Sequence, residues 1–290
     1  MGESFPAIGL EMEAPTRQQS FRRKKMTKQL TGKRGDTPLH SASRAGNLAE
    51  MKVIFSGTGA EDLKELLEKP NQSGETALYV AAEYGYVDVV EEMIKHYDIV
   101  SASIRARNGY DAFHIAAKQG DLEVVKILLK ALPGLSMTVD LSNTTALHTA
   151  ATQGHVEVVN FLLEQDGNVA KIAKSNGKTA LHSAARNGHV EIVKALLSKE
   201  PGIATRTDKK GQTALHMAVK GSNIELVEEL IKLDPYLINM VDSKGNTALH
   251  IATRKGRAQG LHTMHSGDDF WRGCSPYYGP IYEVRSFRTG

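Results

Sequence analysis

The chain has 290 residues, of which 41% are apolar, 24% are charged and 6% are aromatic, and its formal net charge is +3 at pH 7. No stretch approaches the roughly 20 apolar residues that a membrane-spanning helix needs, and the first residues lack the pattern of a signal peptide. The single cysteine, Cys274, excludes an internal disulfide and is typical of a reducing compartment. We therefore expect the chain, as given, to be cytoplasmic, with the nucleus as the alternative location.

Residues 1–30 carry no apolar periodicity. Six cations lie between Arg17 and Lys28, and this composition predicts a disordered basic arm. Three roles stay open for the arm: a solvated tail, a nuclear-import signal, or attachment of residues 17–28 to an anionic membrane surface. Ser20 follows Arg17 by three residues, as basic-directed kinases favour, so it is a candidate phosphorylation site whose phosphate would weaken attraction to anionic lipid.

The middle of the chain is built from a recurring phrase, Thr-Ala-Leu-His in its commonest form. The spacing from one copy to the next is 39, then 35, then 34 residues four times. The opening Thr or Asp can cap a helix, and an alanine follows five residues later in every copy. A glycine ends each helix except in the sixth copy, where Ser222 takes that position. The seven copies begin at Thr37, Thr76, Asp111, Thr145, Thr179, Thr213 and Thr247.

Each copy continues with a second amphipathic segment, such as Val156–Leu163 or Val190–Leu197. Two places before each cap residue stands a glycine, or Asn143 in the fourth copy, and both residue types tolerate the positive φ of a tight turn. This pattern predicts a hairpin finger between repeats. The fingers, and with them the repeats, start near residues 35, 74, 109, 143, 177, 211 and 245.

These motifs resemble the ankyrin repeat, a turn and two antiparallel helices over about 33 residues. The resemblance implies an all-α solenoid of about seven helix-turn-helix repeats over residues 31–256, with hairpin fingers and an incomplete last repeat. The basic start and the near-identical 34-residue repeats further resemble plant ankyrin-repeat proteins with a C-terminal membrane (PGG-type) domain. That narrower resemblance implies stress or defence signalling at the cytoplasmic face of the plasma membrane.

Residues 257–290 do not continue the repeat. Leu261 and Met264 fit a second helix, but Gly260 and His265 do not, and no period follows after Ser266. We interpret this tail as an ending that replaces the membrane domain. A short isoform and an error in the gene model both remain open.

The chain offers no convincing catalytic chemistry. One histidine per repeat forms a ladder, which cannot converge on a single metal ion, and the resemblance gives these histidines hydrogen bonds to backbone between repeats. Gly57-Thr-Gly59 lacks the features of a phosphate-binding loop, and there is no Gly-x-Ser-x-Gly motif. We therefore expect no catalytic residue, no cofactor site and no metal site.

The resemblance also indicates which residues would contact a partner: the two before each finger glycine, the one after it, and the two before the helix-ending position. Among these 35 positions only Asp36, Glu75 and Glu83 are acidic, so the set carries +10 and the rest of the chain −7. The thirteen basic positions are Lys33, Arg34, Arg44, Arg107, Lys118, Lys178, Arg186, Lys209, Lys210, Lys220, Lys244, Arg254 and Lys255.

Three interpretations of this basic set are open. The cations can simply solvate the repeats, or they can bind an acidic protein segment, or they can bind nucleic acid. Nucleic acid is disfavoured because Tyr84 and Tyr110 are the only aromatic contact positions available for stacking. We favour a non-catalytic scaffold that binds an acidic segment through its C-terminal half, where repeats five to seven hold eight of the thirteen cations, and we expect Lys209, Lys210, Lys220 and Arg254 to be exposed.

Overall fold

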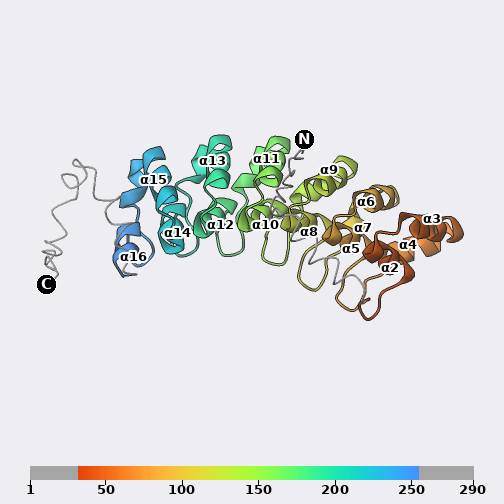
Figure 1. Cartoon of the computed structure of the whole chain (residues 1–290). Coiled ribbons are helices and arrows are strands. Elements are labelled where there is room, and N and C mark those ends of the chain that lie inside the picture. Colours follow the sequence, from red (N-terminus) through yellow and green to blue (C-terminus); the bar gives the residue numbers. More distant parts are fainter. Residues whose placement is uncertain (1–31, 255–290) are drawn as a thin grey trace, which may run out of the picture. The chain divides into compact units, whose positions relative to one another are not determined.

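The structure, a computed structural model, describes residues 32–254. Ser20 and the basic arm, Lys255, and the tail 257–290 lie outside these residues, so the domain boundaries at 30 and 256 stay predictions. The described chain contains α-helices and 3-10 helices and no strand, which confirms the all-α fold class. It divides into two compact units, the first ending at Leu135 and the second beginning at Ser136 (Figure 1).

The first unit contains repeats one to three. Its first helices lie in one row and its second helices in another, with the fingers projecting from the first row (Figure 1). Its helices are α2 (Pro38–Ala45), α3 (Leu48–Gly57), α4 (Ala60–Glu68), α5 (Ala77–Tyr84), α6 (Val87–Ile94), α7 (Ile99–Ala102), α8 (Ala112–Gln119) and α9 (Leu122–Ala131), followed by η1 (Pro133–Met137) at its boundary.

The longer first spacing is explained by α4, a helix that the repeat pattern does not predict. Two carboxylates, Glu61 and Asp62, lie in its first turn, where their negative charges interact favourably with the positive end of the helix dipole. Its Leu67 is buried, and the Leu67 carbonyl accepts a hydrogen bond from the Tyr97 hydroxyl at 3.0 Å. The inserted residues therefore extend the first repeat by one packed helix and leave the later repeats in register.

The second unit contains repeats four to seven and shows the same two rows (Figure 1). The predicted second helices are present and run two residues further than the two apolar segments quoted from the sequence. The helices are α10 (Ala146–Gln153), α11 (Val156–Gln165), η2 (Gly167–Lys171), α12 (Ala180–Asn187), α13 (Val190–Lys199), η3 (Pro201–Ile203), α14 (Ala214–Gly221), α15 (Ile224–Leu233), η4 (Pro235–Asn239) and α16 (Ala248–Arg254).

One position of the first helix is alanine in every repeat because the first helices pack closely. The alanines five residues after each cap, from Ala42 to Ala252, are all fully buried. Second helices add a single apolar stripe: in α13 it consists of Ile192, Val193, Leu196 and Leu197. Within each unit the repeats thus bury their apolar sides against one another, and the finger ends of the first helices keep their polar residues.

The sixth repeat shows why its glycine is displaced. Ser222 adopts the left-handed conformation at the helix end, with φ 69°, which glycine adopts in repeats one to five. Gly221, one residue earlier, lies inside α14, where a Cβ would approach the Arg186 carbonyl oxygen to 2.3 Å. Glycine is therefore needed at 221 for the close contact between α12 and α14, and Ser222 accepts the unfavourable backbone conformation instead.

Candidate interaction surface

Backbone hydrogen bonds join the fingers of the second unit. The Lys209 N–H donates to the Asn176 carbonyl at 3.0 Å, and the Ser243 N–H donates to the Lys210 carbonyl at 2.9 Å. Within a finger, a buried aspartate holds the turn: Asp242 Oδ1 accepts from the N–H groups of Lys244 and Asn246, both at 2.9 Å. The finger tips are therefore a fixed series of sites, spaced by the repeat.

These hydrogen bonds also fix the charge of Asp242. Burial alone would raise its pKa, but the N–H of Asn246 and the side chain of Gln212 more than offset burial, so the pKa of Asp242 lies well below its usual value. Asp208 holds the preceding finger in the same way, accepting from the N–H groups of Lys210 and Gln212. Both carboxylates are buried and serve the backbone of their own fingers.

Three of the recurring histidines tie their first helix to the next finger. Nδ1 of His182 lies 2.9 Å from the Thr179 hydroxyl, and Nε2 lies 2.9 Å from the Gln212 carbonyl. His40 and His216 make the equivalent contacts to the Glu75 and Asn246 carbonyls at 2.7 and 3.1 Å. These three confirm the bridging role that the resemblance implies. Burial lowers the pKa of His40, His182 and His216.

The structure places twelve of the thirteen predicted basic positions. Arg44 is buried, Lys118, Lys178 and Lys220 are half-buried, and Lys255 lies outside the described residues. The other eight are exposed: Lys33, Arg34, Arg107, Arg186, Lys209, Lys210, Lys244 and Arg254.

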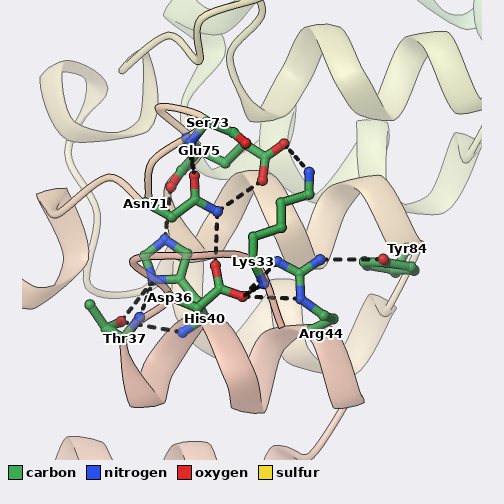
Figure 2. Close-up of polar contacts among 9 residues, drawn as sticks. All are labelled: Lys33, Asp36, Thr37, His40, Arg44, Asn71, Ser73, Glu75 and Tyr84. Carbon is green, nitrogen blue, oxygen red and sulfur yellow. Dashed lines mark hydrogen bonds and ion pairs between the residues drawn. The ribbon is translucent and has the colours of Figure 1, made fainter. Parts of the chain in front are cut away.

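Arg44 is held inside the first unit rather than displayed on its surface. Its Nη2 donates to Asp36 Oδ2 at 2.9 Å, and its Nη1 donates to the Tyr84 hydroxyl at 3.3 Å (Figure 2). The side chains of Arg44 and Asp36 are only 4% and 5% exposed. Arg44 therefore departs from the expectation of an exposed contact residue, because its charge is already neutralised in repeat one.

The same network uses the acidic positions of the first two fingers. Asn71 Nδ2 donates to Asp36 at 2.8 Å and to Glu75 at 2.9 Å, and Lys33 Nζ pairs with Glu75 at 2.5 Å (Figure 2). Burial would raise the pKa of Asp36, but the hydrogen bonds from Asn71, Lys33 N–H and Arg44 together lower it. Asp36 and Glu75 are thus structural anions that join repeat one to repeat two.

Lys220 corrects a second expectation, that of an exposed side chain. It is half-buried, and its Nζ donates to Gln212 Oε1, whose amide in turn donates to Asp242 at 3.1 Å. Burial lowers the pKa of Lys220, as do the nearby charges of Lys178 and Arg186, while Asp208 and Asp242 oppose them. Lys178 and Arg186 of repeat five are therefore close enough to act on the charge of Lys220 in repeat six.

Seven cations of the second unit form what we call the basic face. Within residues 32–254, none of the seven forms an ion pair with a carboxylate. Counting charges along the sequence could not reveal that two of the three acids of the predicted set, Asp36 and Glu75, are engaged within the first unit. The basic face consists of Lys178, Arg186, Lys209, Lys210, Lys220, Lys244 and Arg254.

One exposed apolar residue at a contact position was not singled out by the charge pattern. Leu141, at the finger tip of repeat four, is 84% exposed.

No group of three or more His, Cys, Asp or Glu side chains that could hold a metal ion occurs among residues 32–254. In the same part of the chain, no helix is both long enough and apolar enough to cross a membrane.

A finger followed by two antiparallel helices, repeated with buried alanines and bridging histidines, defines a helical-repeat class whose members present extended binding surfaces. The family model for ankyrin repeats matches residues 20–108, 51–139, 113–207 and 200–270. The chain therefore belongs to the ankyrin-repeat family, whose repeats are protein-interaction modules.

The relatives include plant proteins. An ankyrin repeat-containing protein of Arabidopsis thaliana is 59% identical over 124 residues, which cover 43% of this chain and 24% of the relative. The Arabidopsis ankyrin repeat-containing protein ITN1 is 46% identical over 139 residues, 42% of this chain and 24% of that protein. The chain thus spans about a quarter of the length of these curated relatives.

A solved structure supports the fold alone. The ankyrin repeat domain of Bcl-3, described as a unique member of the IkappaB protein family, aligns with a TM-score of 0.65 at 24% identity. The alignment covers 80% of this chain and all of that domain.

Proposed function

We propose that this chain is a non-catalytic scaffold that binds an acidic segment of a partner protein on its basic face. The observation that carries the proposal is the set of seven cations on consecutive repeats, none of which is paired with a carboxylate of the described chain. Unpaired charge of one sign on neighbouring fingers attracts the opposite sign, speeds association and selects against like-charged partners.

An acidic protein segment fits this surface better than nucleic acid does. No contact position of the second unit is aromatic, so stacking of bases has no platform there. The two aromatic contact positions belong to the first unit, where Tyr84 accepts a hydrogen bond from Arg44 and Tyr110 lies under Lys118. Fingers joined by backbone hydrogen bonds instead offer an extended partner a rigid row of charges.

The setting of this interaction is part of the proposal. The similarity to Arabidopsis ankyrin repeat-containing proteins supports a plant setting. A role in stress or defence signalling at the cytoplasmic face of the plasma membrane is what the narrower resemblance of the sequence implies. A fluorescent fusion of the full chain in plant cells tests the location. Cortical fluorescence that requires residues 17–28 supports membrane attachment, and diffuse fluorescence with or without those residues argues against it.

A decaglutamate peptide tests the binding surface directly. Replacing Lys209, Lys210, Lys244 and Arg254 together by glutamate should weaken binding of the labelled peptide by about tenfold or more. All four are exposed and none forms an ion pair in the described chain, so the variant should keep its fold.

The matched control makes the same change of charge on the second helices. Its four substitutions, Lys52→Glu, Lys130→Glu, Lys199→Glu and Lys232→Glu, lie on exposed positions of α3, α9, α13 and α15. This control should weaken binding by less than about threefold, because screened charges at a distance contribute little. Equal weakening in the two variants, or tighter binding of a single-stranded oligonucleotide than of the peptide, would contradict the proposal.

A further inference from the structure

In three repeats, two positions at the finger side of the first helix contact each other. One position directly precedes the helix N-cap, and the other is the seventh residue of the helix, eight residues later. In repeat one these positions hold Asp36 and Arg44, in repeat three Tyr110 and Lys118, and in repeat six Gln212 and Lys220. The seventh residue is a cation in each of these three repeats, where it lies in the last turn of the helix.

In these three repeats the residue before the N-cap provides a partner for the cation. Asp36 pairs with Arg44 at 2.9 Å, and Gln212 Oε1 accepts a hydrogen bond from Lys220. In repeat three, Lys118 Nζ lies 5.2 Å from the centroid of the Tyr110 ring, a cation–π geometry. The two positions therefore act as an acceptor and a donor within one repeat.

Repeat five breaks this rule, because both positions are cationic. Lys178 precedes the N-cap Thr179, and Arg186 is the seventh residue of α12. Within residues 32–254, neither side chain forms an ion pair or a hydrogen bond. The cation of α12 therefore shares its repeat with a second cation at the position where repeats one, three and six supply a partner.

A third cation joins the pair from the next repeat. Gly221 packs directly on the Arg186 carbonyl, since a Cβ there would approach that oxygen to 2.3 Å, and Lys220 immediately precedes Gly221. The charges of Lys178 and Arg186 both act on Lys220 and help to lower its pKa. Two buried acids, Asp208 and Asp242, act on Lys220 in the opposite direction, but each is bound to N–H groups of its own finger, and within the described residues neither forms an ion pair with these three cations.

We infer that repeat five is the anchor of the basic face, where one anionic group of the bound segment, a carboxylate or a phosphate monoester, docks between Lys178 and Arg186. This inference rests on the proposed function and names the point of the face at which recognition is concentrated. The ligand oxygens take the place that Asp36 fills in repeat one. Arginine suits the role because its planar guanidinium binds carboxylate or phosphate with two parallel hydrogen bonds.

Lys178→Asp tests the inference without any ligand. This substitution reproduces the Asp36–Arg44 pair in repeat five, and it removes the repulsion among three cations. We expect the melting temperature to rise by about 2 °C, whereas Lys199→Asp, the same change of charge on exposed α13, should leave it unchanged or lower. A Lys178→Asp variant that melts no higher than Lys199→Asp would overturn the arrangement inferred here.

Binding of labelled decaglutamate to the full chain gives the second readout. Lys178→Asp supplies the anchor with its own anion, so it should weaken peptide binding about tenfold more than Lys199→Asp does. Equal weakening by the two substitutions would overturn the anchor and leave the proposed function standing. Failure of the parent chain to bind decaglutamate would overturn the proposed function, and the anchor with it.

A modified peptide identifies the source of the anion. Replacing one central glutamate by phosphoserine should tighten binding to the parent chain if the anchor prefers phosphate, and should leave or weaken it if the anchor prefers carboxylate. Either preference should disappear in Lys178→Asp. A preference that persists unchanged in this variant would show that the anionic group docks elsewhere and would overturn the inference.

Discussion

Helix α2 in repeat one and helix α12 in repeat five have the same length, the same threonine cap and an arginine at the same place near the end. In repeat one the arginine pairs with Asp36 and is buried, whereas in repeat five Arg186 faces Lys178 and is exposed. The same helix scaffold thus carries opposite electrostatics in repeat one and in repeat five. The comparison teaches that a basic residue at a contact position indicates binding only where the chain itself supplies no anion.

The contrast extends to the cations of the two units. Lys33, Arg44 and Lys118 each have a partner within the first unit. No cation of the basic face pairs with a described carboxylate. The first unit therefore engages three of its five predicted contact cations in contacts of its own, whereas the second unit leaves all seven cations of the basic face without a described carboxylate partner.

The largest effect should come from breaking the buried pair of repeat one. Arg44→Ala leaves Asp36 without its ion pair in a buried site, which should lower the free energy of unfolding by about 3 kcal/mol. Arg34→Ala, at an exposed position of the neighbouring finger, should change it by less than about 0.5 kcal/mol. Urea unfolding followed by circular dichroism measures both, and similar losses would show that Arg44 is not a structural residue.

Substitution at the contact between repeats five and six should lower the stability of the chain nearly as much. Gly221→Ala should destabilise the chain by about 1–3 kcal/mol, because its Cβ meets the Arg186 carbonyl, although alanine favours helix. Gly57→Ala is the matched control, since Gly57 also lies in a helix but no atom lies within 4 Å of the added Cβ. Stabilisation by both substitutions would argue against the close approach of α12 and α14.

Much of this fold could be predicted from the sequence, because each repeat carries its own local folding signals. The capping threonines, the buried alanines and the turn glycines act over a few residues, so they are readable without tertiary information. The position of Ser222 at the end of its helix could be predicted for the same reason. Helix α4 could not be, because it occurs once and lacks a side-chain cap.

The candidate site was only partly predictable, since pairing is a tertiary property. The sequence identifies Asp36, Glu75 and Arg44 as charges at contact positions, but their bonds span 8 to 42 residues along the chain. Side-chain exposure is equally difficult to predict from the sequence. Lys209 and Lys220 fit the same pattern, yet Lys220 is half-buried and its Nζ donates a hydrogen bond to Gln212. Which cations are available follows only from the packed repeats.

The buried histidines should contribute similarly to the pH dependence of stability in the two units. Burial depresses the folded pKa of His40 and His182 below the unfolded value near 6.5. Unfolded chains therefore bind more protons below that pH, so the stability these histidines contribute is complete above pH 6.5 and is lost as the pH falls. Each accounts for at most about 1.4 kcal/mol per pH unit.

Unfolding midpoints at pH 7.5 and 5.5 measure this dependence while the low-pKa carboxylates stay ionised. His40→Gln and His182→Gln should each reduce the difference between the two midpoints by a similar amount. A reduction confined to one of them would show that the histidine bridges differ between the two units.

The smallest effect should come from the pair of the first unit whose cation, Lys33, is exposed. Lys33 is 40% exposed, so Lys33→Ala should cost less than about 1 kcal/mol although its ion pair with Glu75 is short. High salt should reduce the difference further, because it screens exposed charges. A loss as large as that of Arg44→Ala, measured by the same urea titration, would mean that exposure does not separate the two pairs.

The central claim, that the unpaired cations of the basic face attract an acidic segment, is tested most directly by association kinetics. Stopped-flow mixing of labelled decaglutamate with the full chain should give an association rate that falls steeply between 50 and 300 mM salt, with a nearly constant dissociation rate. Reversal of Lys209, Lys210, Lys244 and Arg254 should slow association and flatten its dependence on salt. An association rate that is independent of salt, or that has the same salt dependence in the parent and the reversed variant, would contradict the claim.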